Sequence, residues 1–193
     1  PIINFKSLVN KFLSYDHGWS GNTKRIYRDS LNKYINEGFP SNKSYRAMIV
    51  RCLNRCYKWG SEQGLIDNPK HFSGGNDYEA RMRIFNDSEL DLILNKIEPY
   101  PFQLFVRFAY YTGARQGEIR QLTEDNIKHG YVDGKVGRRQ IKITQQAKDV
   151  LEQSPELWDY SRGQICKTFK KNMIRLNIAD ARFHDLRRTF GLN

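Results

Sequence analysis

The sequence is short of cysteine, of long apolar runs and of acidic residues, and each shortage excludes a class of protein. Cys52 and Cys56 are one helical turn apart, but no matching Cys/His cluster exists, so we interpret the pair as core filling and predict no metal site. No apolar run is long enough to span a membrane and no signal peptide is recognisable, which makes a reducing cytoplasm the natural setting.

Acidic residues are outnumbered, because 21 Asp and Glu stand against 32 Lys and Arg, which gives a net charge of +11 and an isoelectric point near 9.6. Such an imbalance favours a nucleic-acid partner over an anionic membrane or an acidic protein. Residues 1–75 carry a net charge of +7 and the remainder carries +4. We therefore expect the N-terminal part to supply much of the affinity for a polyanion.

What the sequence does have is helical periodicity. Apolar residues recur at helical spacing over 5–13, from 23 to 35 and over 45–57, which predicts a helical bundle over residues 1–72. Basic side chains occupy largely other faces of these helices, and their excess over acids favours a DNA-facing surface over a merely solvated one. The basic residues on these faces are Lys24, Arg25, Arg28, Lys43 and Arg46, together with Arg51, Arg55 and Lys58.

Residues 73–83 lack apolar periodicity and read as a linker, and a second domain follows over 84–193. Its first helix has Asn86 or Asp87 as a cap, and its second, strongly apolar helix over 102–111 ends at Gly113. A short helix from Arg115 to Leu122 comes next.

Residues 127–144 differ from the helical segments before them. Tyr131-Val132, the turn formers Asp133-Gly134 and the run Gln140–Thr144 predict a small antiparallel sheet. Helices resume at about 145–152 and 161–176. The predicted fold is therefore mostly α, with a small antiparallel β-sheet in the second domain.

Two short segments combine residues suited to phosphate chemistry. In one, Arg115 precedes Glu118 by three residues, so a carboxylate can orient a guanidinium whose donors face outward. In the other, His184 precedes Arg187 at the same spacing. Two arginines and a histidine on a basic chain suit a phosphodiester whose oxygens gain charge during reaction.

These segments resemble the tyrosine recombinases, the phage-integrase type of site-specific DNA recombinase. Residues 112–122 (TGARQGEIRQL) are similar to that family's first arginine box, 184–190 (HDLRRTF) to its second, and 134–143 (GKVGRRQIKI) to the hairpin that carries its lysine. The resemblance covers nearly the whole chain, in the family's order. It implies a core-binding domain and a catalytic domain that close around duplex DNA, with the linker crossing the backbone.

The resemblance also implies a role for each residue. Arg115 and Arg187 would direct donors at the two non-bridging oxygens of the scissile phosphate, the alternative being ordinary surface ion pairs. His184 would act as an acid/base or donate to the phosphate, the alternative being a core histidine. Glu118 would orient Arg115 rather than touch DNA.

Lys135 is the implied general acid, which would protonate the departing 5′ oxygen. A lysine pKa of about 10 must be lowered for that task, and neighbouring cations would help. The alternative is a plain phosphate contact, because Arg138, Arg139 and Lys142 compete for the same alignment. Arg138 and Arg139 are predicted to contact DNA.

This chain departs from the family's pattern in two places. Arg188 stands where the family usually has histidine, which adds a cation with no evident partner. The family continues past the second box to a nucleophilic tyrosine, whereas this sequence ends at Asn193 and none of its eleven tyrosines has a matching context. We therefore expect a catalytic domain incomplete at its C-terminus, which binds DNA but lacks the nucleophile.

The resemblance implies integration or excision of a mobile element such as a phage, by strand cleavage and rejoining through a 3′-phosphotyrosyl intermediate. The covalent bond conserves the energy of the broken one, so no metal, ATP or other cofactor is implied. The implied partners are double-stranded DNA, further protomers in a tetramer on DNA, and a DNA-bending accessory protein, at the nucleoid of a bacterial or archaeal cytoplasm. A type IB topoisomerase and a non-catalytic DNA-binding regulator of the same fold are the alternatives.

Overall fold

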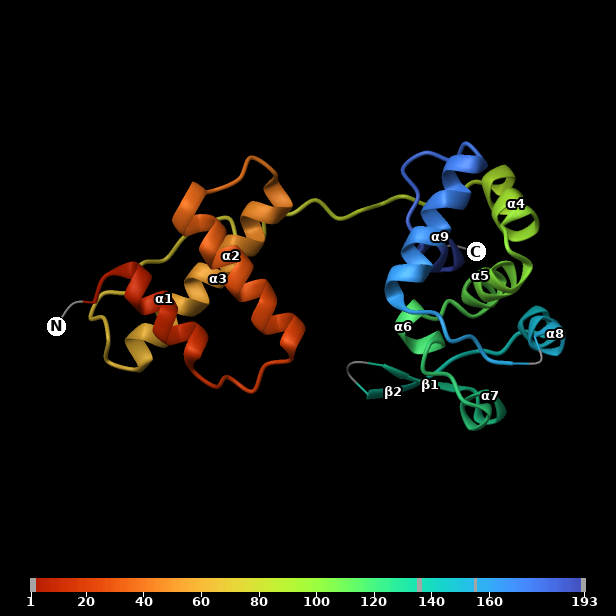
Figure 1. Ribbon diagram of the computed structural model, residues 1–193, viewed down its shortest axis with the longest axis horizontal. Coiled ribbons are helices and arrows are strands. Elements are labelled where there is room, and N and C mark those ends of the chain that lie inside the picture. The colour runs from red at the N-terminus through yellow and green to blue at the C-terminus, as the bar shows by residue number, and fades with distance from the viewer. Residues whose placement is uncertain (1–2, 135–136, 155, 192–193) are drawn as a thin grey trace. The chain divides into compact units, whose positions relative to one another are not determined.

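The structure, a computed structural model, describes residues 3–134, 137–154 and 156–191. The chain divides into two compact units, Pro1–Arg81 and Met82–Asn193 (Figure 1). The division falls inside the segment 73–83, where the sequence lacks apolar periodicity. Each unit has a hydrophobic core of its own.

The N-terminal unit is helical, with α1 (Phe5–Ser14), α2 (Gly21–Glu37) and α3 (Lys43–Glu62). Each of these helices begins at a polar cap: the side chains of Asn4, Ser20 and Asn42 accept hydrogen bonds from backbone N–H groups of the first turn. The apolar stripes that the sequence shows pack against one another. The fully or nearly fully buried residues at their centre are Leu8, Val9, Phe12, Leu31, Ile49, Cys52, Leu53, Cys56 and Trp59.

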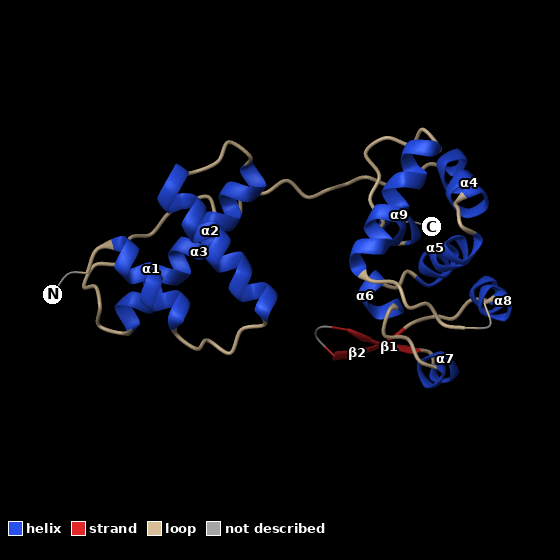
Figure 2. Ribbon diagram, viewed as in Figure 1, coloured by secondary structure: helices blue, strands red, loops and turns tan. Residues whose placement is uncertain are grey.

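The C-terminal unit packs helices around α5, and a two-stranded antiparallel sheet lies beside them (Figure 2). The fold class predicted from the sequence, mostly α with a small antiparallel sheet, is confirmed. The elements in chain order are α4 (Asp87–Lys96), α5 (Tyr100–Thr112), α6 (Gln116–Ile119), α7 (Glu124–His129), β1 (Tyr131–Gly134), β2 (Gly137–Gln140), α8 (Gln145–Gln153), α9 (Arg162–Arg175) and α10 (Asp185–Phe190).

Helix α5 is the centre of this second core because it is apolar on almost every side. Phe102, Phe105 and Phe108 are at most 1% exposed, and they pack against Trp158 and other aromatic rings. A helix that is apolar all round must be covered on all faces. Helices α4, α8 and α10 supply that cover, and α10 carries the second arginine motif.

The sheet differs from its prediction in register. Asp133 and Gly134 are strand residues of β1, paired with Arg138 and Gly137, and not turn residues. The second strand ends at Gln140 instead of continuing to Thr144. Its partner strand begins only at Tyr131, because Gly130 in front of it is left-handed with a φ of 65°. The backbone N–H of Ile141 still donates to the carbonyl of Gly130 at 2.9 Å, but residues 142–144 are not in a strand, and Thr144 caps α8.

One short helix lies within the first arginine motif, and another follows it. The helix expected from Arg115 to Leu122 is reduced to α6, with Arg115 as its N-cap residue. Helix α7 was not predicted, although Thr123 caps it and its side chain accepts from the Asn126 N–H at 3.2 Å. In the described part of the chain, no helix combines the length and apolarity needed to cross a membrane.

Candidate active site

The site forms where α5 ends and α10 passes it. Gly113 ends α5 with a φ of 59°, a left-handed conformation that glycine adopts at low cost. A Cβ at this position would lie 2.3 Å from Cδ1 of Phe190, so only glycine allows α10 to pack this closely. Arg187 of α10 donates through Nη1 to the Gly113 carbonyl, 74 residues away in the sequence. The two arginine motifs are thus in direct contact.

Glu118 is the buried anion of the site, with only 3% of its surface exposed. Its Oε2 accepts from the backbone N–H of Arg115 at 2.7 Å, and its Oε1 accepts from Nη1 of Arg115 at 2.8 Å. Arg139 donates to the same two oxygens, from Nε at 3.0 Å and from Nη2 at 2.6 Å. The carboxylate therefore orients Arg115, as the sequence suggested, and also binds Arg139.

Glu118 is ionised at neutral pH. Burial alone would raise its pKa, but the hydrogen bonds from Arg139 and from the backbone and side chain of Arg115 outweigh burial and lower the pKa to about 2. The neutral form is thereby excluded over the physiological range. The site retains a fixed negative charge that can hold two guanidinium groups in place.

Arg115 keeps donors available for a ligand. Its side chain is 53% exposed, and Nη1 is the guanidinium nitrogen that bonds to Glu118. Within the described ranges, no group accepts from its Nε or Nη2. A guanidinium fixed at one corner, with its remaining donors directed outward, suits bidentate binding of a phosphate.

Arg187 lies within electrostatic reach of the same group. Its pKa is lowered first by burial and then by the positive charges of Arg115 and Arg139, while Glu118 partly compensates. The cost of holding these cations together would fall if an anion bound between them. The cluster is therefore a site that favours a negatively charged ligand.

His184 precedes α10 and stands at the edge of this cluster. It is exposed, but the protein around its ring excludes part of the water, which lowers its pKa, and Arg188, Arg187 and Arg115 lower it further. The opposing effect of Asp185 is smaller. The lowered pKa favours the neutral imidazole, which can accept a proton. The alternative of a core histidine does not fit an exposed side chain.

Arg188 has a partner that the sequence analysis missed. Its Nη1 donates to Oδ1 of Asp185 at 2.7 Å, and Asp185 is fully buried. The other oxygen of Asp185 accepts from the backbone N–H of Arg182 at 2.8 Å. The i,i+3 spacing of Asp185 and Arg188 was a signal that could have identified the pair.

Of the three hairpin residues selected from the sequence, Lys135 lies outside the described residues, and Arg138 and Arg139 are described. Arg138 is 62% exposed, pairs with Asp133 at 3.2 Å and covers the Tyr131 ring at 3.8 Å from its centroid. Arg139 instead turns toward Glu118. The two neighbouring arginines, both predicted to contact DNA, therefore have different surroundings.

The basic residues singled out in the N-terminal unit are all exposed. Lys24, Arg25 and Arg28 lie on the first half of α2, and Arg51 and Arg55 of α3 come close enough to Tyr27 to oppose the burial that raises its pKa. Lys43 and Arg46 lie on the first turn of α3, where Arg46 covers the Phe39 ring at 4.8 Å from its centroid.

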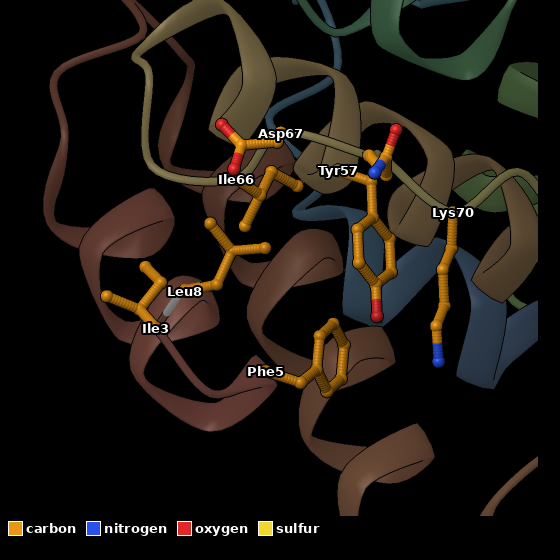
Figure 3. Close-up of a pocket in the computed structure, with 8 residues that line it drawn as sticks. Ile3, Phe5, Leu8, Tyr57, Ile66, Asp67 and Lys70 are labelled. Carbon is orange, nitrogen blue, oxygen red and sulfur yellow. The ribbon is translucent and has the colours of Figure 1, made fainter. Parts of the chain in front are cut away.

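The N-terminal unit also has a pocket of about 350 Å³ (Figure 3). Phe5 and Leu8 of α1 line it together with Tyr57 of α3, and Lys70 and Asp67 stand at its edge. It is a gap between α1, α3 and the chain that follows α3.

Known proteins were compared with this chain by family, by sequence and by structure. No family model matches, and no curated protein matches either. Among solved structures, a lambda integrase dimer bound to a COC′ core site has a TM-score of 0.74 at 17% identity, over 97% of this chain and 69% of that one. A lambda integrase tetramer bound to a Holliday junction has a TM-score of 0.76 at 16% identity, over 98% and 72%.

The structure of a transposon integrase is also similar to this chain. The Tn1549 integrase in complex with transposon right end DNA has a TM-score of 0.73 at 12% identity, over 95% of this chain and 84% of that one. The chain has the tyrosine-recombinase fold. Arg115, Glu118, His184 and Arg187, selected from sequence motifs, come together in the C-terminal unit of this fold.

Proposed function

We propose that this protein is a tyrosine recombinase, which binds duplex DNA and breaks and rejoins it through a 3′-phosphotyrosyl intermediate. The observation that supports this is the cluster of Arg115, Arg139 and Arg187 around the single carboxylate of Glu118. Arg139 makes a bidentate ion pair with Glu118, which leaves the positive charges of Arg115 and Arg187 to face a ligand. A phosphodiester carries one negative charge and its pentacovalent transition state carries two, so the cluster favours the transition state.

In this proposal, Arg115 and Arg187 bind the two non-bridging oxygens of the scissile phosphate. A tyrosine hydroxyl oxygen attacks phosphorus, the P–O5′ bond breaks, and Lys135 gives its proton to O5′ to release a 5′ hydroxyl. His184, whose lowered pKa favours the neutral imidazole, accepts the tyrosine proton; if it instead donates a hydrogen bond to the phosphate, that proton goes to water. Rejoining runs the same steps in reverse with a new 5′ hydroxyl.

The nucleophile is proposed to be a tyrosine other than the eleven in these 193 residues. The solved structures with this fold hold integrases on a core site, on a Holliday junction and on transposon DNA. We accordingly propose the integration or excision of a mobile element, by a tetramer on two DNA sites, in the cytoplasm of the host cell. A DNA-bending accessory protein is an additional proposed partner.

Trapping on a nicked suicide substrate tests the proposal, because the departing strand is lost and a covalent adduct accumulates. The 193-residue polypeptide should bind the DNA but form no adduct, whereas the full-length protein should form one. Mass spectrometry should place it on a tyrosine outside these residues. An adduct on one of the eleven tyrosines would refute the assignment of the nucleophile, and no adduct from the full-length protein would favour a DNA-binding regulator.

Arg187→Ala in the full-length protein tests the role of the cluster. Loss of one preorganised donor should lower the rate of adduct formation by at least ~100-fold while the affinity for DNA changes little. If rate and affinity fell by the same factor, Arg187 would be a uniform binding contact, and the proposed stabilisation of the transition state would be wrong.

A further inference from the structure

Arg139 lies on the inner face of the hairpin. In β2 it pairs with Val132 of β1, and residues that pair across a sheet project from the same face. Val132 is fully buried, whereas Arg138, the preceding residue of β2, projects from the opposite face and is 62% exposed. The side chain of Arg139 is 32% exposed. Its position in the strand therefore directs it toward α6 and away from solvent.

The guanidinium of Arg139 binds Glu118 through its Nε and Nη2 nitrogens. Nε and Nη2 donate to the two carboxylate oxygens at 3.0 and 2.6 Å, which is the side-on bidentate geometry that a phosphate would otherwise use. The remaining nitrogen, Nη1, is 3.4 Å from the carbonyl oxygen of Gln140. This guanidinium is occupied within the protein, unlike that of Arg115.

Glu118 contacts both strands of the hairpin. Besides binding Arg139 on β2, its Oε1 lies so near Gly134 of β1 that a Cβ there would be 3.2 Å away. Each carboxylate oxygen accepts one hydrogen bond from Arg139 and one from Arg115. A single buried carboxylate thus joins Arg115 to the strands on either side of residues 135–136.

We propose that Arg139 is a positioning residue, which acts through Glu118 to hold strands β1 and β2 in a fixed relation to Arg115. This rests on the proposed function. In the proposed function Arg115 binds the phosphate, and Lys135, which lies between these two strands in the sequence, supplies the proton that O5′ needs when the P–O5′ bond breaks. Without Arg139, the proton donor loses its alignment while the phosphate and its cations remain in place.

A sulfur substitution at the leaving group tests this role. In a 5′-phosphorothiolate substrate the P–S bond breaks and a thiolate leaves, which scarcely needs protonation. Arg139→Ala in the full-length protein should lower the rate of adduct formation on the normal substrate at least ~10-fold, because general acid catalysis contributes ~100-fold or more. On the sulfur substrate the same variant should stay within about 2-fold of the wild-type rate, as a defect in proton donation predicts.

Matched variants separate this role from others. Arg115→Ala should lower the rate on both substrates by similar factors. Arg138→Ala, next to Arg139 but on the opposite face, should leave the ratio of the two rates at the wild-type value. Arg139→Lys keeps the charge but loses the bidentate Nε–Nη2 edge, so it should retain part of the rate on the normal substrate, and it carries the test if Arg139→Ala does not fold.

Each other outcome has a defined meaning. If Arg139→Ala is equally slow on both substrates, Arg139 stabilises the phosphate directly and the proposal is wrong. If it weakens DNA affinity and reduces the salt dependence by about one phosphate contact, without rescue by sulfur, it is a DNA contact and the proposal is also wrong. Failure of the wild-type protein to form an adduct on either substrate would instead overturn the proposed function.

Discussion

At the scale of single residues, Glu118 connects the first arginine motif to the hairpin through four accepted hydrogen bonds. The sequence identified the i,i+3 relation of Glu118 to Arg115, because that spacing is local. It could not identify the relation to Arg139, 21 residues further on, because that contact depends on the register of β1 and β2. Local spacing therefore predicted half of this ion-pair network.

The depressed pKa of Glu118 makes it a source of pH-dependent stability. A carboxyl whose pKa is lowered from 4.5 to about 2 stabilises the folded state fully above pH 4.5 and loses this contribution as the pH falls toward 2. Glu118→Gln should therefore lower the free energy of unfolding by up to about 3 kcal/mol at pH 7. The difference between wild type and variant should shrink toward zero near pH 2.

Urea unfolding at pH 7, 4 and 2.5 measures this difference. Glu152→Gln, at an exposed position of α8, is the control and should follow the wild type at every pH. A Glu118→Gln deficit that is the same at pH 7 and pH 2.5 would show that the charge of Glu118 is not what stabilises the fold.

Gly113 and Gly117 offer a second matched pair in the same motif. Alanine at 113 must adopt a φ of 59° and place its Cβ 2.3 Å from the Phe190 ring, so Gly113→Ala should lower the free energy of unfolding by about 1–3 kcal/mol or more. At Gly117, in α6, a Cβ meets nothing within 4 Å, and Gly117→Ala should be neutral or stabilising by up to about 1 kcal/mol. Equal losses in thermal or urea unfolding would contradict the close contact between α5 and α10.

At the scale of elements, the long helices could be predicted from the sequence, whereas for the short elements the bounds could not be predicted and α7 was missed. Helices α1 to α5, α8 and α9 each show an apolar stripe that their burial explains. Helix α7 has six residues, too few to show a period, and the bounds of β2 follow from its register with β1. What the sequence missed was therefore decided by neighbouring elements and not by local pattern.

A buried hydrogen bond joins helix α10 to the segment that precedes α4. The backbone N–H of Phe85 donates to Oγ1 of Thr189 at 3.0 Å, and this hydroxyl donates to the carbonyl of Asp185 at 2.9 Å. Thr189 is 3% exposed, so no water replaces a lost partner easily. The hydroxyl thereby fixes the helix that bears Arg187.

Thr189→Val should expose the importance of this hydroxyl because valine keeps the shape but cannot accept a hydrogen bond. The buried N–H of Phe85 would lose its acceptor, which should lower the free energy of unfolding by about 1–3 kcal/mol. Thr189→Ser keeps the hydroxyl and removes one methyl group, with an expected cost of about 1 kcal/mol. Chemical denaturation compares the stabilities of the two variants. A valine variant as stable as the serine variant would contradict the stabilising role of this hydroxyl.

At the scale of the whole molecule, the candidate active site lies in one unit, and much of the net positive charge lies in the other. The guanidinium cluster lies in the C-terminal unit, whereas the N-terminal unit, Pro1–Arg81, carries a net charge of +6 of the chain's +11. Composition alone predicted this division, since charge counting does not depend on the fold. Which of the exposed cations contact DNA depends on their faces, and those faces are set by how α2 and α3 pack.

The N-terminal unit, residues 1–81, should bind duplex DNA by electrostatics through the exposed cations of α2 and α3. Its log affinity should fall linearly with log salt, with a slope that is reduced by about 0.9 for each phosphate contact removed. Replacing Lys24, Arg25 and Arg28 by Gln should therefore flatten the slope by up to ~2.7. The charge-matched control replaces Lys6, Lys11 and Lys70 and should change it less. Equal changes would mean that net charge, and not this face of α2, determines binding.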